Sequence, residues 1–267
     1  MLRQVQDLRD ESQEFRELLE PLSDTDWDRA TLFKSWTVND VLQHLYSGDE
    51  RAVASIDNPA RYDVLTAAMT AAREDGLSRV EEARRRLGDL GGKRLLERYR
   101  EQNDRLCDLL AGLQPGDRLR WGGRSMSARI FAAARQMETW AHAQAIYDLL
   151  GVERLRSDRL RNVAELGVRT FGWTFANRGL PVPEPVPYVR LRAPSGALWE
   201  WNSPAADNRI EGEAFDFCQV VTQVRNIADT RLAVTGSAAR AWMATAQCFA
   251  GPPEDPPAPG VRQRAEA

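Results

Sequence analysis

The sequence predicts an α+β protein, in which a four-helix up-and-down bundle precedes a small α+β domain. Residues 1 to about 150 are rich in Leu, Ala, Arg and Glu, with Gly and Pro confined to breaks, which is typical of long helices. Prolines then recur through residues 179–185, which indicates an extended linker. After the linker the apolar spacing becomes that of strands.

The helical half divides at recognisable breaks. Thr37 is a good N-cap for one of its helices, and Gly151 is a good residue to end the last one. The Gly-rich stretch 88–92 is a possible break inside a longer helical segment, and residues 114–117 form a turn cluster. The helices are predicted at about residues 2–19, 38–56, 61–73, 78–113 and 125–149. Short breaks between long helices favour an up-and-down bundle.

The second half mixes strands and helices. A helix is predicted over residues 157–177, and the strands at 186–191 and 198–201 flank a hairpin turn. The remaining elements are strands near 209–210 and 232–234 and helices at 213–224 and 238–249. The domain boundaries are therefore a bundle at 1–152, a connecting helix and linker at 153–183, the small domain at 184–250 and a proline-rich, disordered tail at 251–267.

Composition excludes several classes of protein. The 36 basic and 39 acidic side chains give a net charge of −3, without the basic excess of a nucleic-acid binder. The sequence contains neither an apolar run long enough for a membrane span nor an apolar stretch typical of a signal peptide at its start. Three scattered cysteines do not suggest a disulfide framework and suit a reducing compartment. We therefore expect a cytoplasmic protein with small-molecule partners, either a monomer or a homodimer.

The chain has only two histidines, His44 and His142, and both lie in predicted helices. Glu138 and His142 are one turn apart on the apolar face of the last bundle helix, a spacing that lets two side chains meet one metal ion. His44 lies on a second face of its helix, among small residues, and Asp40 one turn earlier could fix its tautomer. Two histidines and one carboxylate would form an open three-ligand metal site.

Simpler interpretations of the same residues remain open. Arg135 precedes Glu138 by three residues and could be its ion-pair partner. His142 could be a core histidine whose hydrogen bonds are satisfied, and His44 could be a surface residue at a helix groove. Trp36 and Trp140 are expected to line the core or a pocket.

Two segments resemble a known family. Residues 35–45, SWTVNDVLQHL, resemble the signature of the DinB-like superfamily, and more closely that of the mycothiol-dependent maleylpyruvate isomerase family. Residues 137–142, METWAH, match the Glu-x-x-x-His element of the fourth bundle helix in that family. The resemblance implies that His44, Glu138 and His142 bind a divalent metal, usually zinc. It covers residues 1 to about 150, and this chain looks closest to an uncharacterised actinobacterial metal-binding subgroup.

The C-terminal half resembles the sterol-carrier-protein-like domain of the same family. In family members an arginine after the helix of this domain faces the metal, and Arg225 occupies the corresponding position, with Arg231 as a less close substitute. The resemblance thus implies a catalytic role for Arg225. Residues 242–251 are also similar to a segment associated with wyosine base formation in transfer RNA, but no cysteine cluster for an iron–sulfur site accompanies them.

The resemblance implies a metal-dependent isomerase or S-transferase that uses mycothiol as co-substrate and acts on a small organic electrophile. Two alternatives remain open. The first is a metal-dependent lyase, hydratase or hydrolase that activates water instead of a thiol. The second is a non-catalytic protein that binds a metal or another ligand.

Overall fold

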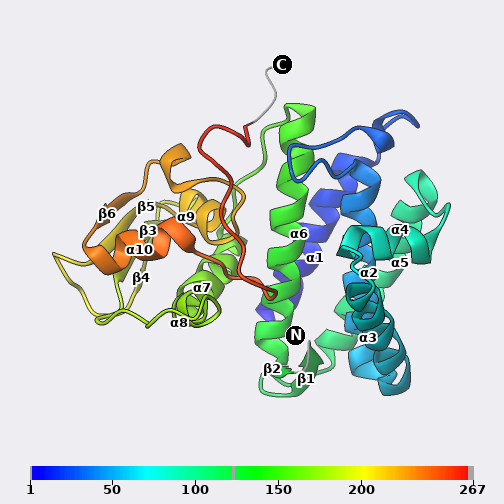
Figure 1. Cartoon of the computed structure of the whole chain (residues 1–267), viewed down its shortest axis with the longest axis horizontal. Coiled ribbons are helices and arrows are strands. Elements are labelled where there is room, and N and C mark those ends of the chain that lie inside the picture. Colours follow the sequence, from blue (N-terminus) through cyan, green and yellow to red (C-terminus); the bar gives the residue numbers. More distant parts are fainter. Residues whose placement is uncertain (1, 122–123, 264–267) are drawn as a thin grey trace. The chain divides into compact units, whose positions relative to one another are not determined.

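The computed structural model describes residues 2–121 and 124–263 (Figure 1). The chain divides into two compact units, Met1–Leu149 and Leu150–Ala267. The first unit is helical apart from one small hairpin, and the second combines helices with a four-stranded sheet. The predicted α+β class is therefore confirmed. No helix among the described residues combines the length and apolarity that a membrane span requires.

Four long helices form the bundle of the first unit. They are α1 (Arg3–Leu19), α2 (Val38–Asp57), α5 (Gly92–Ala111) and α6 (Ala128–Leu150). Helix α5 packs against both α1 and α2. Helix α6 closes the bundle: the Tyr147 hydroxyl contacts Glu14 of α1 at 2.9 Å, and Arg135 pairs with Asp49 of α2 at 2.9 Å. Apolar side chains from all four helices, among them Leu8, Leu45, Leu106 and Phe131, are almost fully buried between them.

The start of α2 is fixed by a capping box. The Thr37 hydroxyl accepts a hydrogen bond from the Asp40 main-chain N–H, and the Asp40 carboxylate accepts one from the Thr37 N–H. Arg84 donates two further hydrogen bonds to Asp40, each 2.6 Å long. The predicted helix start after Thr37 is confirmed, and the position of His44 along α2 follows from it.

Two shorter helices, α3 (Pro59–Glu74) and α4 (Arg79–Leu87), lie between α2 and α5 in the chain and pack on α2. The predicted break near residue 90 is confirmed, because α4 ends at Leu87 and α5 begins at Gly92. Gly88, which caps α4, and Gly92 both have positive φ. One hairpin was not predicted: β1 (Arg118–Trp121) pairs antiparallel with β2 (Arg124–Ser127) directly before α6. The signal for it, two glycines between short alternating segments, was present at residues 122–123, which lie outside the described part.

The second unit contains a sheet of strand order β4-β3-β5-β6. Its strands are β3 (Tyr188–Arg192), β4 (Leu198–Trp201), β5 (Arg209–Glu213) and β6 (Ala233–Thr235). Strands β3 and β5 are parallel, whereas β3–β4 and β5–β6 are antiparallel. The helices are α7 (Arg161–Arg169), α8 (Phe171–Ala176), α9 (Ala214–Val221) and α10 (Ser237–Thr245). The predicted continuous helix over 157–177 is thus divided into α7 and α8, with Thr170 between them.

The prediction of a disordered tail was wrong for residues 251–263. Gln223 donates a hydrogen bond to the Glu254 carbonyl at 2.6 Å, and Asn226 donates one to the Pro257 carbonyl at 2.8 Å. The Gln247 side chain contacts the tail at two points. Proline-rich composition disfavours helix and strand but does not prevent side-chain amides from holding an extended chain. Residues 264–267 of the predicted tail lie outside the described part.

Candidate metal centre

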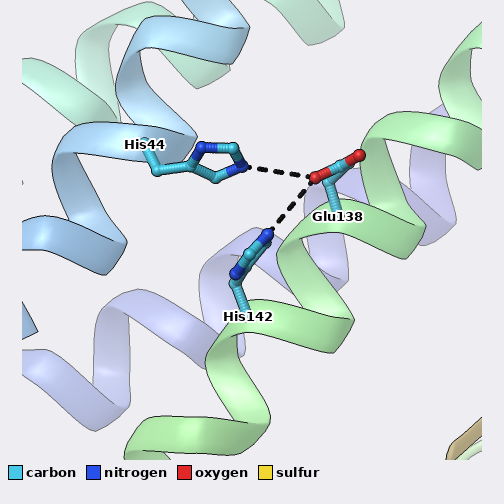
Figure 2. Close-up of side chains that lie close together, drawn as sticks. All are labelled: His44, Glu138 and His142. Atoms are coloured by element: carbon cyan, nitrogen blue, oxygen red, sulfur yellow. Dashed lines mark hydrogen bonds and ion pairs between the residues drawn. The ribbon is translucent and has the colours of Figure 1, made fainter. Parts of the chain in front are cut away.

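The structure brings His44, Glu138 and His142 together (Figure 2). Helix α2 supplies His44, and α6 supplies the other two side chains one turn apart. The Nε2 atoms of both histidines lie 3.4 Å from the same oxygen, Oε2 of Glu138. The side chains of His44, His142 and Glu138 are 16%, 14% and 22% exposed, so the group is largely but not completely buried. Helix periodicity correctly predicted the pairing of Glu138 with His142.

Arg135 is not the partner of Glu138, which answers one of the questions that the sequence left open. The Arg135 guanidinium lies 2.9 Å from Oδ1 of Asp49, and Asn103 donates a hydrogen bond to the other Asp49 oxygen at 2.8 Å. Arg135 and Asp49 are both buried. The printed sequence gave no signal for this pair, because the two residues lie 86 positions apart. With Arg135 engaged by Asp49, the two imidazoles are the side chains that contact the Glu138 carboxylate among the described residues.

Aromatic rings surround the histidines on one side. The Trp36 ring stacks almost parallel on that of His142, with centroids 5.6 Å apart and planes 3° apart, and it is tilted over His44 at 5.3 Å. The Phe33 ring meets His142 edge-on at 5.1 Å. These rings hold the imidazole planes and shield part of the site from water. Trp36 is therefore a wall of the site, one of the two roles expected for it, whereas no motif pointed to Phe33.

The electrostatics suit metal binding. Burial, followed by the neighbouring His142, lowers the pKa of His44 to about 4, although Glu138 acts in the opposite direction. Burial opposes ionisation of Glu138, but the hydrogen bonds from His142 and His44 hold the pKa of its carboxyl well below the ordinary value. His44 is then neutral and Glu138 anionic at neutral pH, which are the forms that coordinate metals.

The spacing of the donor atoms also fits a metal ion. A separation of 3.4 Å is longer than the N–H···O distances of 2.7–3.2 Å that are usual in proteins. Two ligand atoms about 2.1 Å from a tetrahedral zinc ion are themselves about 3.4 Å apart. Nitrogen and carboxylate oxygen are also the ligand types of catalytic zinc sites. The residues present therefore fit a divalent metal such as zinc.

Two further expectations concern neighbouring side chains. Asp40 does not orient His44: its carboxylate instead accepts hydrogen bonds from Arg84 and Thr37 at the start of α2. Arg225 belongs to the second unit, just after α9, where its main-chain N–H donates to the Gln219 carbonyl and its guanidinium to the Val224 carbonyl. The catalytic role of Arg225 stays a prediction.

Comparisons with known proteins agree with this geometry. The family model described as the mycothiol maleylpyruvate isomerase N-terminal domain matches residues 8–147, which include all three proposed ligands. Two proteins of Mycobacterium tuberculosis, Uncharacterized protein MT0041 (strain CDC 1551) and Uncharacterized protein Rv0036c (strain H37Rv), are each 37% identical to this chain over 249 residues. Each match covers 93% of this chain and 96% of the relative.

One solved structure shows the same fold. The crystal structure of the mycothiol-dependent maleylpyruvate isomerase matches with a TM-score of 0.50 at 14% identity, covering 81% of this chain and 86% of that chain. At this identity the likeness concerns the fold alone. The family model, in contrast, matches more than half of the chain. The chain therefore belongs to the family of the mycothiol maleylpyruvate isomerase N-terminal domain, within the DinB-like superfamily.

Proposed function

We propose that the chain is a divalent-metal-dependent enzyme that uses a low-molecular-weight thiol, such as mycothiol, as an isomerase or S-transferase on a small organic electrophile. The observation that carries the proposal is the convergence of two imidazole nitrogens on one carboxylate oxygen at a partly exposed site. Family membership supports the thiol, because the solved relative is named a mycothiol-dependent isomerase. Zinc is the proposed metal because it accepts a His₂–carboxylate set with one position left for a ligand.

Each residue of the site has a separate task in this proposal. A divalent metal held here would lower the pKa of a thiol and favour the thiolate at neutral pH. Glu138 supplies the negative charge that offsets the cation, while His44 and His142 supply neutral nitrogens. Trp36 and Phe33 keep the imidazoles oriented and limit the access of water. Arg225, carried over from the family resemblance, would bind an anionic group of the substrate or thiol.

The reaction class follows from the nucleophile. A thiolate that adds to an electrophilic alkene permits rotation about the former double bond, and its departure completes an isomerisation. A thiolate that stays bonded gives S-transfer, because the π bond of the alkene breaks and the adjacent carbon takes up a proton. A reducing cytoplasm would suit such a co-substrate, and it would also suit the three buried free cysteines.

Metal content tests the site. Purified protein should bind about one zinc ion per chain, and Glu138→Gln and His142→Ala should each weaken binding by at least the ~10–100-fold typical of losing a residue that merely supports a ligand. Glu101→Gln, an exposed glutamate on α5, is the matched control and should bind zinc normally. Isothermal titration against zinc measures the affinities. Wild-type affinity in the Glu138→Gln variant would contradict the proposed ligand set.

Thiol use is tested separately on the metal-loaded protein. Cobalt substitution should give a thiolate-to-cobalt absorption band when mycothiol is added, and turnover of electrophilic alkenes should require both metal and thiol. Turnover without thiol would favour the water-activating alternative. A metal whose spectrum no thiol or water perturbs would favour the non-catalytic binding protein, and either result would refute thiol-dependent catalysis.

A further inference from the structure

A cationic side chain that forms no ion pair with any described residue continues the face of α2 that carries His44. His44, Gly48 and Arg51 follow one another at spacings of four and three residues, so they lie on one face of the helix. Arg51 is two turns beyond His44, about 10 Å further along the helix axis. A ligand that extends from the histidines along this face would pass the Arg135 side chain, which packs over Gly48, before it met Arg51.

Cation-stabilising groups, rather than a carboxylate in ion-pair contact, hold Arg51 among the described residues. Its guanidinium lies over the Trp121 ring, 4.1 Å from the centroid, and its Nη1 is 2.6 Å from the Met69 sulfur. A thioether is only a weak acceptor. The Nε atom is buried and has no hydrogen-bond partner in the described part of the chain. No carboxylate among the described residues forms an ion pair with Arg51.

Two of the acidic residues near Arg51 are already paired with other arginines, and a third, Glu138, acts on Arg51 only through space. Asp49 pairs with Arg135, and Glu50 receives both Arg61 and Arg86. Burial, followed by the positive charges of Arg79 and Arg135, lowers the pKa of Arg51 to about 10. The local charge balance is therefore positive, which is costly for a partly buried group unless an anion binds.

Two more groups belong to this region. Arg79, exposed at the first position of α4, forms no ion pair with any described residue, and its charge reaches both Arg51 and His44 electrostatically. Thr66 lies on α3 one turn before Met69, on the face that meets Arg51, and its hydroxyl is buried without a hydrogen-bond partner among the described residues. The Arg51 Nε–H and the Thr66 hydroxyl, on the neighbouring helices α2 and α3, are thus two buried donors without an acceptor among the described residues.

We propose that Arg51, assisted by Arg79 and Thr66, forms an anion-binding subsite that takes a carboxylate group of the small molecule bound at His44, Glu138 and His142. An arginine that stacks on an aromatic ring while keeping free N–H donors is well suited to bind a carboxylate. The subsite rests on the proposed function only for the identity of the complete ligand. A simple carboxylate should bind it even in the metal-free protein.

The test uses succinate as the probe and the full chain in metal-free and zinc-loaded forms. Isothermal titration should detect succinate in both forms, and the Arg51 Nε–H signal in ¹H–¹⁵N spectra should shift on binding. Arg51→Gln should weaken succinate binding by at least about 10-fold, because a charge-assisted pair is lost. Arg79→Gln should weaken it about 2–5-fold, as expected for an exposed charge.

Three controls make the outcome decisive. Arg98→Gln, an exposed arginine on α5 paired with Glu101, should bind succinate as the wild type does. The uncharged dimethyl ester of succinic acid should not bind. Arg51→Lys keeps the positive charge but loses the planar guanidinium with its paired N–H donors. Its succinate affinity should lie between those of the Arg51→Gln variant and the wild type. Arg51→Lys also tests the proposal if Arg51→Gln fails to fold, which thermal unfolding followed by circular dichroism would reveal.

The result separates the subsite from the proposed enzyme function. Succinate binding that depends on Arg51 without any thiol-dependent turnover would support the subsite while refuting the enzyme. Equal succinate affinity in wild type, Arg51→Lys and Arg51→Gln, or no detectable binding to the wild type, would overturn the subsite whatever the turnover.

Discussion

At the scale of single residues, Gly48 determines how closely α6 can approach α2 beside the metal centre. A Cβ atom at position 48 would lie 2.7 Å from Nη2 of Arg135, closer than side chains approach one another in proteins. Arg135 cannot easily move away, because it is buried and paired with Asp49. A residue that weakens an isolated helix is therefore required here by the packing of the neighbouring helix.

Replacing this glycine should destabilise the fold in spite of better helix propensity. Gly48→Ala gains up to ~1 kcal/mol of propensity, but displacing a buried ion pair costs about 3–5 kcal/mol. We expect a net loss of about 2–4 kcal/mol in the free energy of unfolding, measured by urea denaturation. Gly116→Ala, where a Cβ meets nothing within 4 Å, is the control. The loss should shrink in an Arg135→Met background, and an equal loss in both backgrounds would exclude this clash as the cause.

At the scale of elements, the start of α2 positions His44, and Asp40 is its central residue. Its carboxylate caps the Thr37 N–H and binds Arg84 of α4, so one side chain fixes the helix end and attaches a second helix to it. Sequence spacing predicted the cap but not Arg84, because a contact across 44 residues leaves no local pattern. The unpredicted hairpin before α6 is a different case, since its signal was local.

The role of Asp40 should depend on pH. Burial opposes its charge, but hydrogen bonds from Arg84 and Thr37 lower the pKa of its carboxyl below the ordinary 3.8. The stabilisation is therefore present above about pH 4 and is lost as the pH falls through the lowered pKa. Asp40→Asn should reduce stability by about 1–2 kcal/mol at pH 7 and by much less near pH 2. Urea denaturation across this range measures the difference.

A matched variant tests whether this effect is specific to Asp40. Glu81→Gln alters the equivalent capping-box position of α4, which is exposed and has no bidentate arginine. Its effect at pH 7 should be smaller than that of Asp40→Asn. If the loss in Asp40→Asn were the same at pH 2 and pH 7, the carboxylate charge would not be its source.

At the scale of the whole molecule, local patterns predicted most of the architecture but placed only two of the three proposed ligands together. Periodicity placed Glu138 and His142 on one face, because they share a helix. Their meeting with His44 came from the family resemblance, since nothing in the spacing of α2 and α6 dictates how two distant helices pack. No sequence pattern pointed to Arg51, the proposed subsite residue, because only the structure shows that Asp49 and Glu50 are paired with other arginines and that Arg51 has no ion-pair partner among the described residues.

Removing the tail tests whether the stability of the second unit and the metal affinity of the first unit are independent. Gln223 and Gln247 are buried, and their amides bond the backbone of residues 252–254. A chain ending at residue 250 leaves these amides without their tail partners, at roughly 1 kcal/mol or more for each lost hydrogen bond. We expect the second unit to lose about 2–4 kcal/mol of stability, seen as protease sensitivity of α9 and α10. Zinc affinity should be unchanged, because all three proposed ligands lie in the first unit. A chain ending at Gln263 keeps every one of these bonds and should match the full protein, so weaker zinc binding in the shorter chain alone would mean that the metal centre depends on the second unit.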